Sequence, residues 1–129
     1  MKKVNKNKTI AVFCGSKLGK NTIYKKEVSE ITTILSKNKF SIIYGGGVIG
    51  LMGILYKVYS KLNSKITGII PKFLNKPGIR QKNVKTLEVV CSLHHRKILM
   101  IKKADFFLIL PGGFGTLDEL FEILTLNQL

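Results

Sequence analysis

Acidic residues are scarce in this sequence, and the stretch between Glu30 and Glu88 has none at all. Seven aspartates and glutamates stand against 22 lysines and arginines, which gives a formal net charge of +15. The lysines are spread out, with no dense cluster after the N-terminal tail, and they form no basic stripe with interleaved aromatic residues. That pattern is typical of solvated lysine faces and argues against a nucleic-acid partner. The charge would still draw small phosphorylated ligands toward the protein.

Cysteines and long apolar runs are equally scarce. Two cysteines, Cys14 and Cys91, are too few for a disulfide framework in a chain whose 45% hydrophobic content supplies its own core. No apolar run approaches the length of a membrane span, and the N-terminus lacks the apolar segment of a signal peptide. His94 and His95 have no second cluster of ligands at metal spacing. We therefore expect a globular protein of the reducing cytoplasm, with no metal site and no membrane partner.

Apolar runs alternate with amphipathic segments along the chain. The pattern predicts strands at 9–14, 40–44, 65–70, 86–90 and 104–110, the first and the last of them buried. It predicts helices at 22–38, 51–62, 93–103 and from about 117 onward, with Thr22 and Ser92 as possible N-caps. Strands that alternate with helices indicate an α/β fold, in which a parallel sheet is covered on both faces. Residues 1–8 are expected to be a flexible lead-in, and 9–129 a single domain.

The final helix is unusually apolar. A short domain cannot cover all of its large apolar residues, which are Leu117, Leu120, Phe121, Ile123, Leu124, Leu126 and Leu129. Such a helix is usually buried in a core or an interface. The pattern indicates either a chain truncated at its C-terminal side or a helix that packs on a second subunit, and we expect a homodimer.

The run from Pro111 to Glu119 is the most informative motif. A glycine-rich turn lies there between a predicted strand and a predicted helix, an arrangement that points backbone N–H groups at an anion. Asp118, Glu119 and Glu122 stand at the same helix start. A pair of carboxylates beside such a turn suits the hydrolysis of a glycosidic bond. Glu119 also has a purely structural interpretation, as the partner of an N-cap Thr116 in a capping box.

Two further features leave alternatives open. Residues 45–50 follow a strand and match G-x-G-x-x-G, yet no acid follows at the distance that dinucleotide sites need. These glycines could contact a mononucleotide or a phosphate, or could let a helix pack close to the sheet. Arg96 is one of two arginines among many lysines. Its planar fork suits a phosphate or carboxylate held at two points, and the alternative is an ordinary surface arginine.

In combination, the motifs resemble those of the LOG (Lonely Guy) family, often labelled lysine decarboxylases. They are Cys14-Gly-Ser16, Tyr44-Gly-Gly-Gly-x-x-Gly-Leu-Met-Gly53, His95-Arg-Lys97 with Met100, and Pro111-Gly-Gly-Phe-Gly-Thr-x-x-Glu119. The resemblance implies a Rossmann-like, doubly wound, nucleotide-binding domain that is typically dimeric. It implies hydrolysis of cytokinin riboside 5′-monophosphates, and often AMP, to the free base and ribose 5-phosphate, with no cofactor or metal.

The same resemblance assigns residues to roles. Arg96 and Glu119 would be the catalytic pair. The predicted substrate-binding residues are Gly15, Ser16, Gly45, Gly46, Lys97, Gly112, Gly113, Gly115, Thr116, Glu122 and Thr125. Arg96 would either hold Glu119 and the substrate or assist the leaving base. The loop at 71–85 lacks the acid that the family uses there, which keeps open a second interpretation, a module that binds a nucleotide without cleaving it.

Overall fold

The computed structural model describes residues 7–15 and 22–129. Most of the predicted lead-in at 1–8, the first turn after Gly15 and the predicted site residue Ser16 therefore lie outside the described residues.

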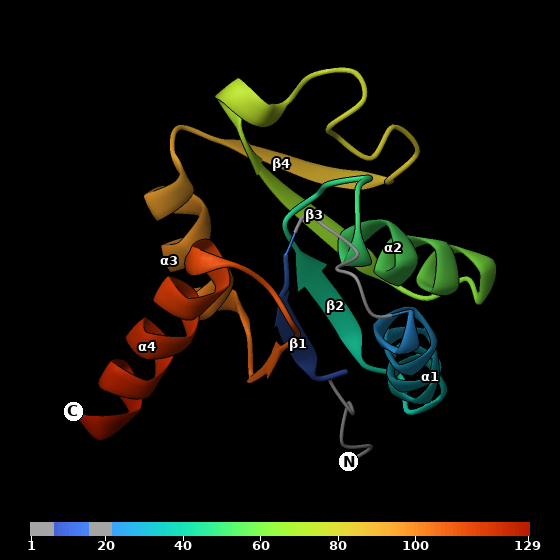
Figure 1. Ribbon diagram of the computed structural model, residues 1–129, viewed down its shortest axis with the longest axis horizontal. Helices are drawn as coiled ribbons and strands as arrows, with labels where there is room; N and C mark the ends of the chain where they lie inside the picture. Colours follow the sequence, from blue (N-terminus) through green and yellow to red (C-terminus); the bar gives the residue numbers. More distant parts are fainter. Residues whose placement is uncertain (1–6, 16–21) are drawn as a thin grey trace, which may run out of the picture.

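A five-stranded parallel sheet forms the centre of the fold (Figure 1). Its strands are β1 (Thr9–Phe13), β2 (Ser41–Tyr44), β3 (Ile66–Pro71), β4 (Thr86–Val90) and β5 (Phe106–Ile109). They lie in the order β4-β3-β2-β1-β5, so β1 lies inside the sheet and pairs with both β2 and the edge strand β5. The order reverses between β1 and β5, which is where open α/β sheets place their ligands.

Helices cover both faces of the sheet, as the alternating pattern predicted. The helices α1 (Ile23–Lys37) and α2 (Leu51–Lys61) lie together on one side, and α3 (Leu93–Lys103) lies on the other (Figure 1). The fourth helix, α4 (Phe114–Gln128), runs beside α3, and a short 3-10 turn at Lys72–Leu74 follows β3. The doubly wound α/β fold class expected from the sequence is confirmed.

The two apolar cores follow from the alternation of side chains along the strands. In β1, Ile10 and Val12 point into the core under α1 and α2, together with Leu55. Ala11 and Phe13 point into the core under α3, which contains Met100. Four of the five β1 residues are buried, so the prediction that β1 is buried on both faces is confirmed.

The prediction that the last strand is buried is wrong. Strand β5 lies at the edge of the described sheet, and Phe106 is 51% exposed while the other β5 residues are half-buried. Its apolar sequence gave the appearance of a central strand, but α4 leans away from it toward α3 (Figure 1). Burial depends on which elements lie beside a strand, and the sequence of that strand does not contain this information.

Helix capping differs between the two predicted N-caps. Ser92 Oγ accepts a hydrogen bond of 3.0 Å from the His95 backbone N–H at the start of α3. Thr22 also occupies an N-cap position, but its side chain forms no capping hydrogen bond. Only the first of these two residues therefore stabilises its helix in the predicted way.

The capping hydrogen bond of Ser92, which Thr22 lacks, leads to a prediction about stability. Ser92→Ala should lower the free energy of unfolding by about 1 kcal/mol, because the His95 N–H loses its acceptor. Thr22→Ala is the matched control and should change it by a few tenths of that amount. Urea unfolding of the two variants and the parent measures both values. Equal losses in the two variants would contradict the assigned cap.

Candidate active site

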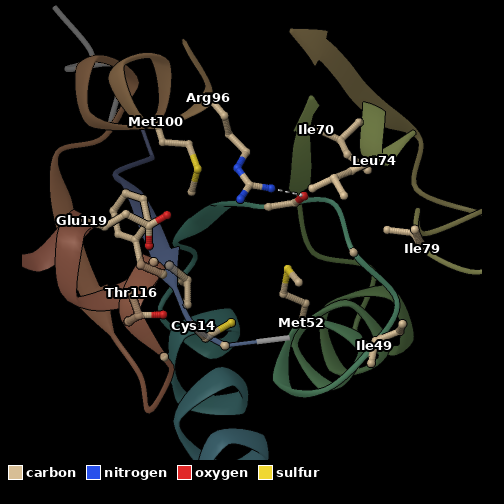
Figure 2. Close-up of a pocket in the computed structure, with 17 residues that line it drawn as sticks. Cys14, Ile49, Met52, Ile70, Leu74, Ile79, Arg96, Met100, Thr116 and Glu119 are labelled. Carbon is tan, nitrogen blue, oxygen red and sulfur yellow. Dashed lines mark hydrogen bonds between the residues drawn. The ribbon is translucent and has the colours of Figure 1, made fainter. Parts of the chain in front are cut away.

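A cavity of about 460 Å³ opens at the carboxyl ends of the central strands. Its walls come from the end of β1, the glycine turn after β2, the segment after β3, helix α3 and the start of α4 (Figure 2). The volume lies in the range of pockets that hold small molecules. Because distant segments meet here, residues 12–15 line the same space as Gly113, Gly115, Thr116 and Glu119.

The start of α4 differs from the predicted one. The helix begins at Phe114 with Gly113 as N-cap, and no side chain caps it. The predicted capping box of Thr116 and Glu119 is therefore wrong, because Thr116 lies inside the first turn and is buried. The earlier start places Gly113, Gly115 and Thr116 on the cavity wall, where free backbone N–H groups of a helix N-terminus favour an anion.

Arg96 reaches into the cavity from α3. Its Nη1 donates a hydrogen bond of 3.2 Å to the Gly45 carbonyl, which holds one side of the guanidinium (Figure 2). A Cβ atom at position 45 would come within 3.2 Å of the same Nη1, so glycine there leaves room for the arginine. Burial lowers the pKa of Arg96, and the charge of Glu119 opposes that shift. Arginine remains protonated under such conditions, so the cavity contains a fixed positive charge.

Glu119 enters the cavity from the neighbouring wall, on α4. Figure 2 shows its carboxylate and the Arg96 guanidinium both directed into the open space. Within the described residues the two groups form no ion pair. Burial raises the pKa of Glu119 from 4.5 to about 7, Arg96 and Lys97 oppose this shift, and Asp118 adds to it. The carboxyl group thus changes charge near neutral pH, as groups in active sites often do.

The remaining wall of the cavity is apolar. Ile49, Met52, Leu74 and Ile79 lie on the side across from α4 (Figure 2). The Cys14 thiol faces the same space, and burial raises its pKa to about 12, so it is a neutral group there. A ligand with a charged end and an apolar or aromatic end would match this division of the walls.

The structure brings only some of the predicted site residues together. Those that line the cavity are Arg96, Glu119, Gly15, Gly45, Gly113, Gly115 and Thr116. Five others that the structure describes lie off its wall, namely Gly46, Lys97, Gly112, Glu122 and Thr125. Thr125 is exposed, and its hydroxyl donates to the Phe121 carbonyl within α4.

Two of the predicted glycines serve close approaches between backbone segments. Gly46 has a φ of +74°, and its Cα lies 2.9 Å from where a Cβ of Gly68 would stand. A Cβ at Gly112 would lie 2.8 Å from the Gly15 nitrogen and closer still to Thr116. The Gly15 N–H itself donates to the Pro111 carbonyl at 3.1 Å. That amide therefore joins the β1 turn to the α4 turn, and it is not free to bind a ligand.

Lys97 and Glu122 are paired with each other behind the cavity wall. Lys97 Nζ forms an ion pair with Glu122 and a second one of 2.9 Å with Asp118. These contacts connect α3 to α4 through the residue after Arg96 and through residues on either side of Glu119. The prediction of paired carboxylates at the site is accordingly not matched by the geometry, because Glu122 faces Lys97.

Sequence reasoning did not assign a role to the apolar wall. Ile49, Leu74 and Ile79 stand in loops after β2 and β3, and only the topology shows that these loops face α4. One feature of the sequence could have predicted their position. These loops follow parallel strands, and the carboxyl ends of such strands meet at one edge of the sheet.

The part of the chain that the structure describes contains neither a candidate metal site nor a candidate membrane-spanning helix. There, no three His, Cys, Asp or Glu side chains gather in a way that could hold a metal ion. His94 and His95 are exposed. No described helix is both long enough and apolar enough to cross a membrane.

Comparison with known proteins places the chain among curated relatives. It is 41% identical over 125 residues to the Arabidopsis thaliana cytokinin riboside 5′-monophosphate phosphoribohydrolase LOG1, covering 97% of this chain and 59% of the relative. It is 38% identical over 122 residues to a probable enzyme of the same name, LOGL3, from Oryza sativa subsp. japonica, covering 95% and 58%. The chain thus spans about three fifths of the length of these relatives.

Solved structures support the fold. The molybdenum cofactor binding protein from Rippkaea orientalis superposes with a TM-score of 0.80 at 18% identity, covering 96% of this chain and 74% of that one. The molybdenum cofactor carrier protein from Chlamydomonas reinhardtii gives 0.80 at 16% identity, covering 95% and 73%. At such identities the likeness concerns the fold alone.

A family model described as "Possible lysine decarboxylase" matches residues 52–129, which include Arg96, Glu119 and most of the cavity wall. Together with the relatives at 38–41% identity, this match shows that the chain belongs to the LOG family.

Proposed function

We propose that this protein hydrolyses the N-glycosidic bond of purine or cytokinin riboside 5′-monophosphates, AMP among them. The observation that carries the proposal is the placement of Arg96 and Glu119 on neighbouring walls of one cavity that also contains the α4 N-terminus. The names of the curated relatives support the substrate class. The products would be the free base and ribose 5-phosphate, with no cofactor involved.

The geometry suggests how a substrate would lie. The 5′-phosphate would accept hydrogen bonds from the backbone N–H groups at the α4 start, near Gly115 and Thr116. The ribose would then lie between Glu119 and Arg96, and the base would contact the apolar wall. This arrangement uses the charged and the apolar sides of the cavity for the matching ends of one ligand.

The reaction breaks the bond between C1′ and the base nitrogen. A water molecule supplies a hydroxyl to C1′, and its proton balances the base that leaves. Positive charge develops on the sugar in the transition state, so an ionised Glu119 would stabilise that charge or orient the water. Arg96 would position Glu119 and the substrate, or would stabilise the negative charge on the departing base.

Incubation of AMP and a cytokinin riboside 5′-monophosphate with the purified protein, followed by chromatography, tests the proposal. Release of free base and ribose 5-phosphate is expected. One observation favours the second candidate function, which is binding without cleavage. No acidic residue lies between Glu30 and Glu88, so the loop that contributes Leu74 and Ile79 to the cavity has none. If the nucleotide remains intact after incubation but binds to the protein with measurable affinity, the second function would be the correct one.

The same proposal includes a homodimer in the cytoplasm. Helix α4 leaves large apolar side chains exposed, with Phe114 at 93%, Phe121 at 61% and Leu124 at 52%. A second copy would cover them, as contiguous apolar patches of this kind usually mark interfaces. Sedimentation at micromolar concentration should give the dimer mass, and a monomer that binds no apolar dye would contradict it.

Activity should depend on pH through Glu119. Its pKa rises from 4.5 to about 7 in the folded protein, so the active carboxylate is lost as the pH falls through 7. We expect kcat/KM to be constant above pH 8 and to fall about tenfold per pH unit below 6, as for a single required ionisation.

The phosphate of the substrate also titrates, with a pKa of about 6. AMP affinity measured across the same pH range in Glu119→Gln isolates that contribution, because the variant has no carboxyl group at this position. A kcat/KM that remains constant down to pH 5 would contradict the assignment of the ionised Glu119 to catalysis.

A further inference from the structure

We propose that Lys97 is a positioning residue, which joins α3 to α4 and so sets the separation of Arg96 and Glu119. This proposal rests on the proposed function, and it differs from the role in substrate binding that the family resemblance implies for Lys97.

Little else fixes α4 in place. Every α4 residue is described, and only Thr116 and Ile123 of them are buried. Glu119 lies on this loosely packed helix, whereas Arg96 lies on α3, whose Met100 is buried in the core. Within the described residues, Arg96 forms no ion pair with Glu119 that could set their separation directly.

Lys97 supplies the missing connection. Its side chain is only 12% exposed, and Nζ contacts both Asp118 and Glu122. Asp118 precedes Glu119, and Glu122 follows it by one helical turn, so the two contacts lie on either side of the catalytic carboxylate along α4. A lysine held at two points in this way restricts both sliding and rotation of the helix.

The pairing also occupies the lysine. Both acids hold the ammonium, and their hydrogen bonds raise the pKa of Lys97. Lys97 is not one of the described residues that line the cavity, whereas its neighbour Arg96 is. Two of the three N–H donors of the ammonium are engaged by these carboxylates, which hold Nζ away from the cavity.

The chain offers a matched control on the same helix. Lys103 of α3 forms an ion pair of 2.8 Å with Glu88, and the two side chains are 44% and 43% exposed. This pair lies away from α4, since Glu88 belongs to β4. Lys103→Met therefore removes the same charge and one ion pair from α3 without affecting the connection between α3 and α4.

The first experiment compares Lys97→Met, Lys97→Arg and Lys103→Met in steady-state hydrolysis of AMP. Displacement of a catalytic group by about 1 Å lowers rates by about 100-fold. We expect kcat of Lys97→Met to fall at least about tenfold while KM changes less than about threefold. Lys97→Arg should recover most of the rate, and Lys103→Met should equal the parent. A KM that rises while kcat stays constant would overturn the proposal in favour of substrate binding.

A second variant guards against misfolding of Lys97→Met and separates the two interpretations further. Asp118→Asn combined with Glu122→Gln frees Lys97 without removing it. The positioning role predicts a loss of kcat similar to that of Lys97→Met. If Lys97 instead binds the phosphate, the double variant should keep or improve the rate, and that result would overturn the proposal.

The third measurement needs no activity, so it distinguishes failure of this proposal from failure of the proposed function. The chain has only seven acidic residues, so carbon-13 NMR can follow Glu119 directly, with Glu119→Gln to assign its signal. The charged and titratable groups around it are Cys14, Arg96, Lys97 and Asp118. In Lys97→Met the pKa of Glu119 should rise above that of the parent, because the opposing charge of Lys97 is lost and α4 is released from α3. In Lys103→Met it should not change. An unchanged pKa in Lys97→Met would overturn the proposal even in a protein that hydrolyses nothing.

Discussion

Arg96→Lys should lower AMP hydrolysis by about 100-fold or more, while the protein stays folded. Lysine keeps the positive charge, but it lacks the planar fork that donates to the Gly45 carbonyl with one nitrogen and faces the cavity with the others. The ammonium of lysine cannot keep the Gly45 contact and reach the substrate together. Steady-state kinetics and a melting curve on the same preparation measure both effects.

Arg80 supplies the control for this substitution. It is the only other arginine of the chain, and its Nη1 donates to Asn75 in the loop after β3. Arg80→Lys should retain nearly the parent rate. An Arg96→Lys variant that also turns over at the parent rate would show that charge alone suffices, and would remove the assigned role of the guanidinium.

Glu119→Gln should nearly abolish hydrolysis, with a loss on the order of 100-fold or more. Glutamine has almost the same shape but no negative charge to oppose the developing sugar cation. Nucleotide binding should persist, because the expected donors to the phosphate are backbone groups at the α4 start that the substitution does not touch.

The stability of the same variant should change in the opposite direction to its activity. Because the pKa of Glu119 is raised in the folded protein to about 7, ionising the buried carboxyl destabilises the fold. That destabilisation is absent below pH 4.5 and fully present above pH 7. We therefore expect Glu119→Gln to melt at or above the parent temperature at pH 8, and the two proteins to converge at pH 4.

Glu88→Gln is the control for charge removal, since Glu88 lies in an exposed ion pair with Lys103. Such pairs contribute about 0–1 kcal/mol, so both rate and stability should stay near the parent values. If Glu119→Gln were as active as Glu88→Gln, Glu119 would be a structural residue and the proposed chemistry would have no carboxylate.

The elements of this fold were predictable where local sequence determines them. Residues 9–13 form a run without polar side chains after Thr9, so a strand covered on both faces is the one structure that suits them. Ser92 could be assigned as a cap because capping involves only the three residues that follow it.

The errors concern contacts between distant segments. An edge strand and a central strand of this type share the same apolar pattern, so β5 was placed wrongly. The N-terminus of α4 begins earlier than its motif suggested, and Thr116 is buried beside Gly112 rather than exposed as a cap. The motif placed Arg96 and Glu119 at the site, but the double pairing of Lys97 depends on how α3 and α4 lie side by side.

The pairing of β1 with β5 has a consequence for how the site is formed during folding. Thr9 and Asp105 are hydrogen-bonded across 96 positions of sequence, and Gly15 meets Pro111 over a similar separation. Contacts of such long range form slowly, because a large loop must close before they stabilise anything. The half of the sheet made by β1, β2 and β3 involves shorter loops and should assemble first. During refolding, signals from the core under α1 and α2 should therefore recover before nucleotide binding does, whereas the core under α3 includes Ile123 of α4 and should recover with it. A chain released before α4 emerges from the ribosome would lack the phosphate site.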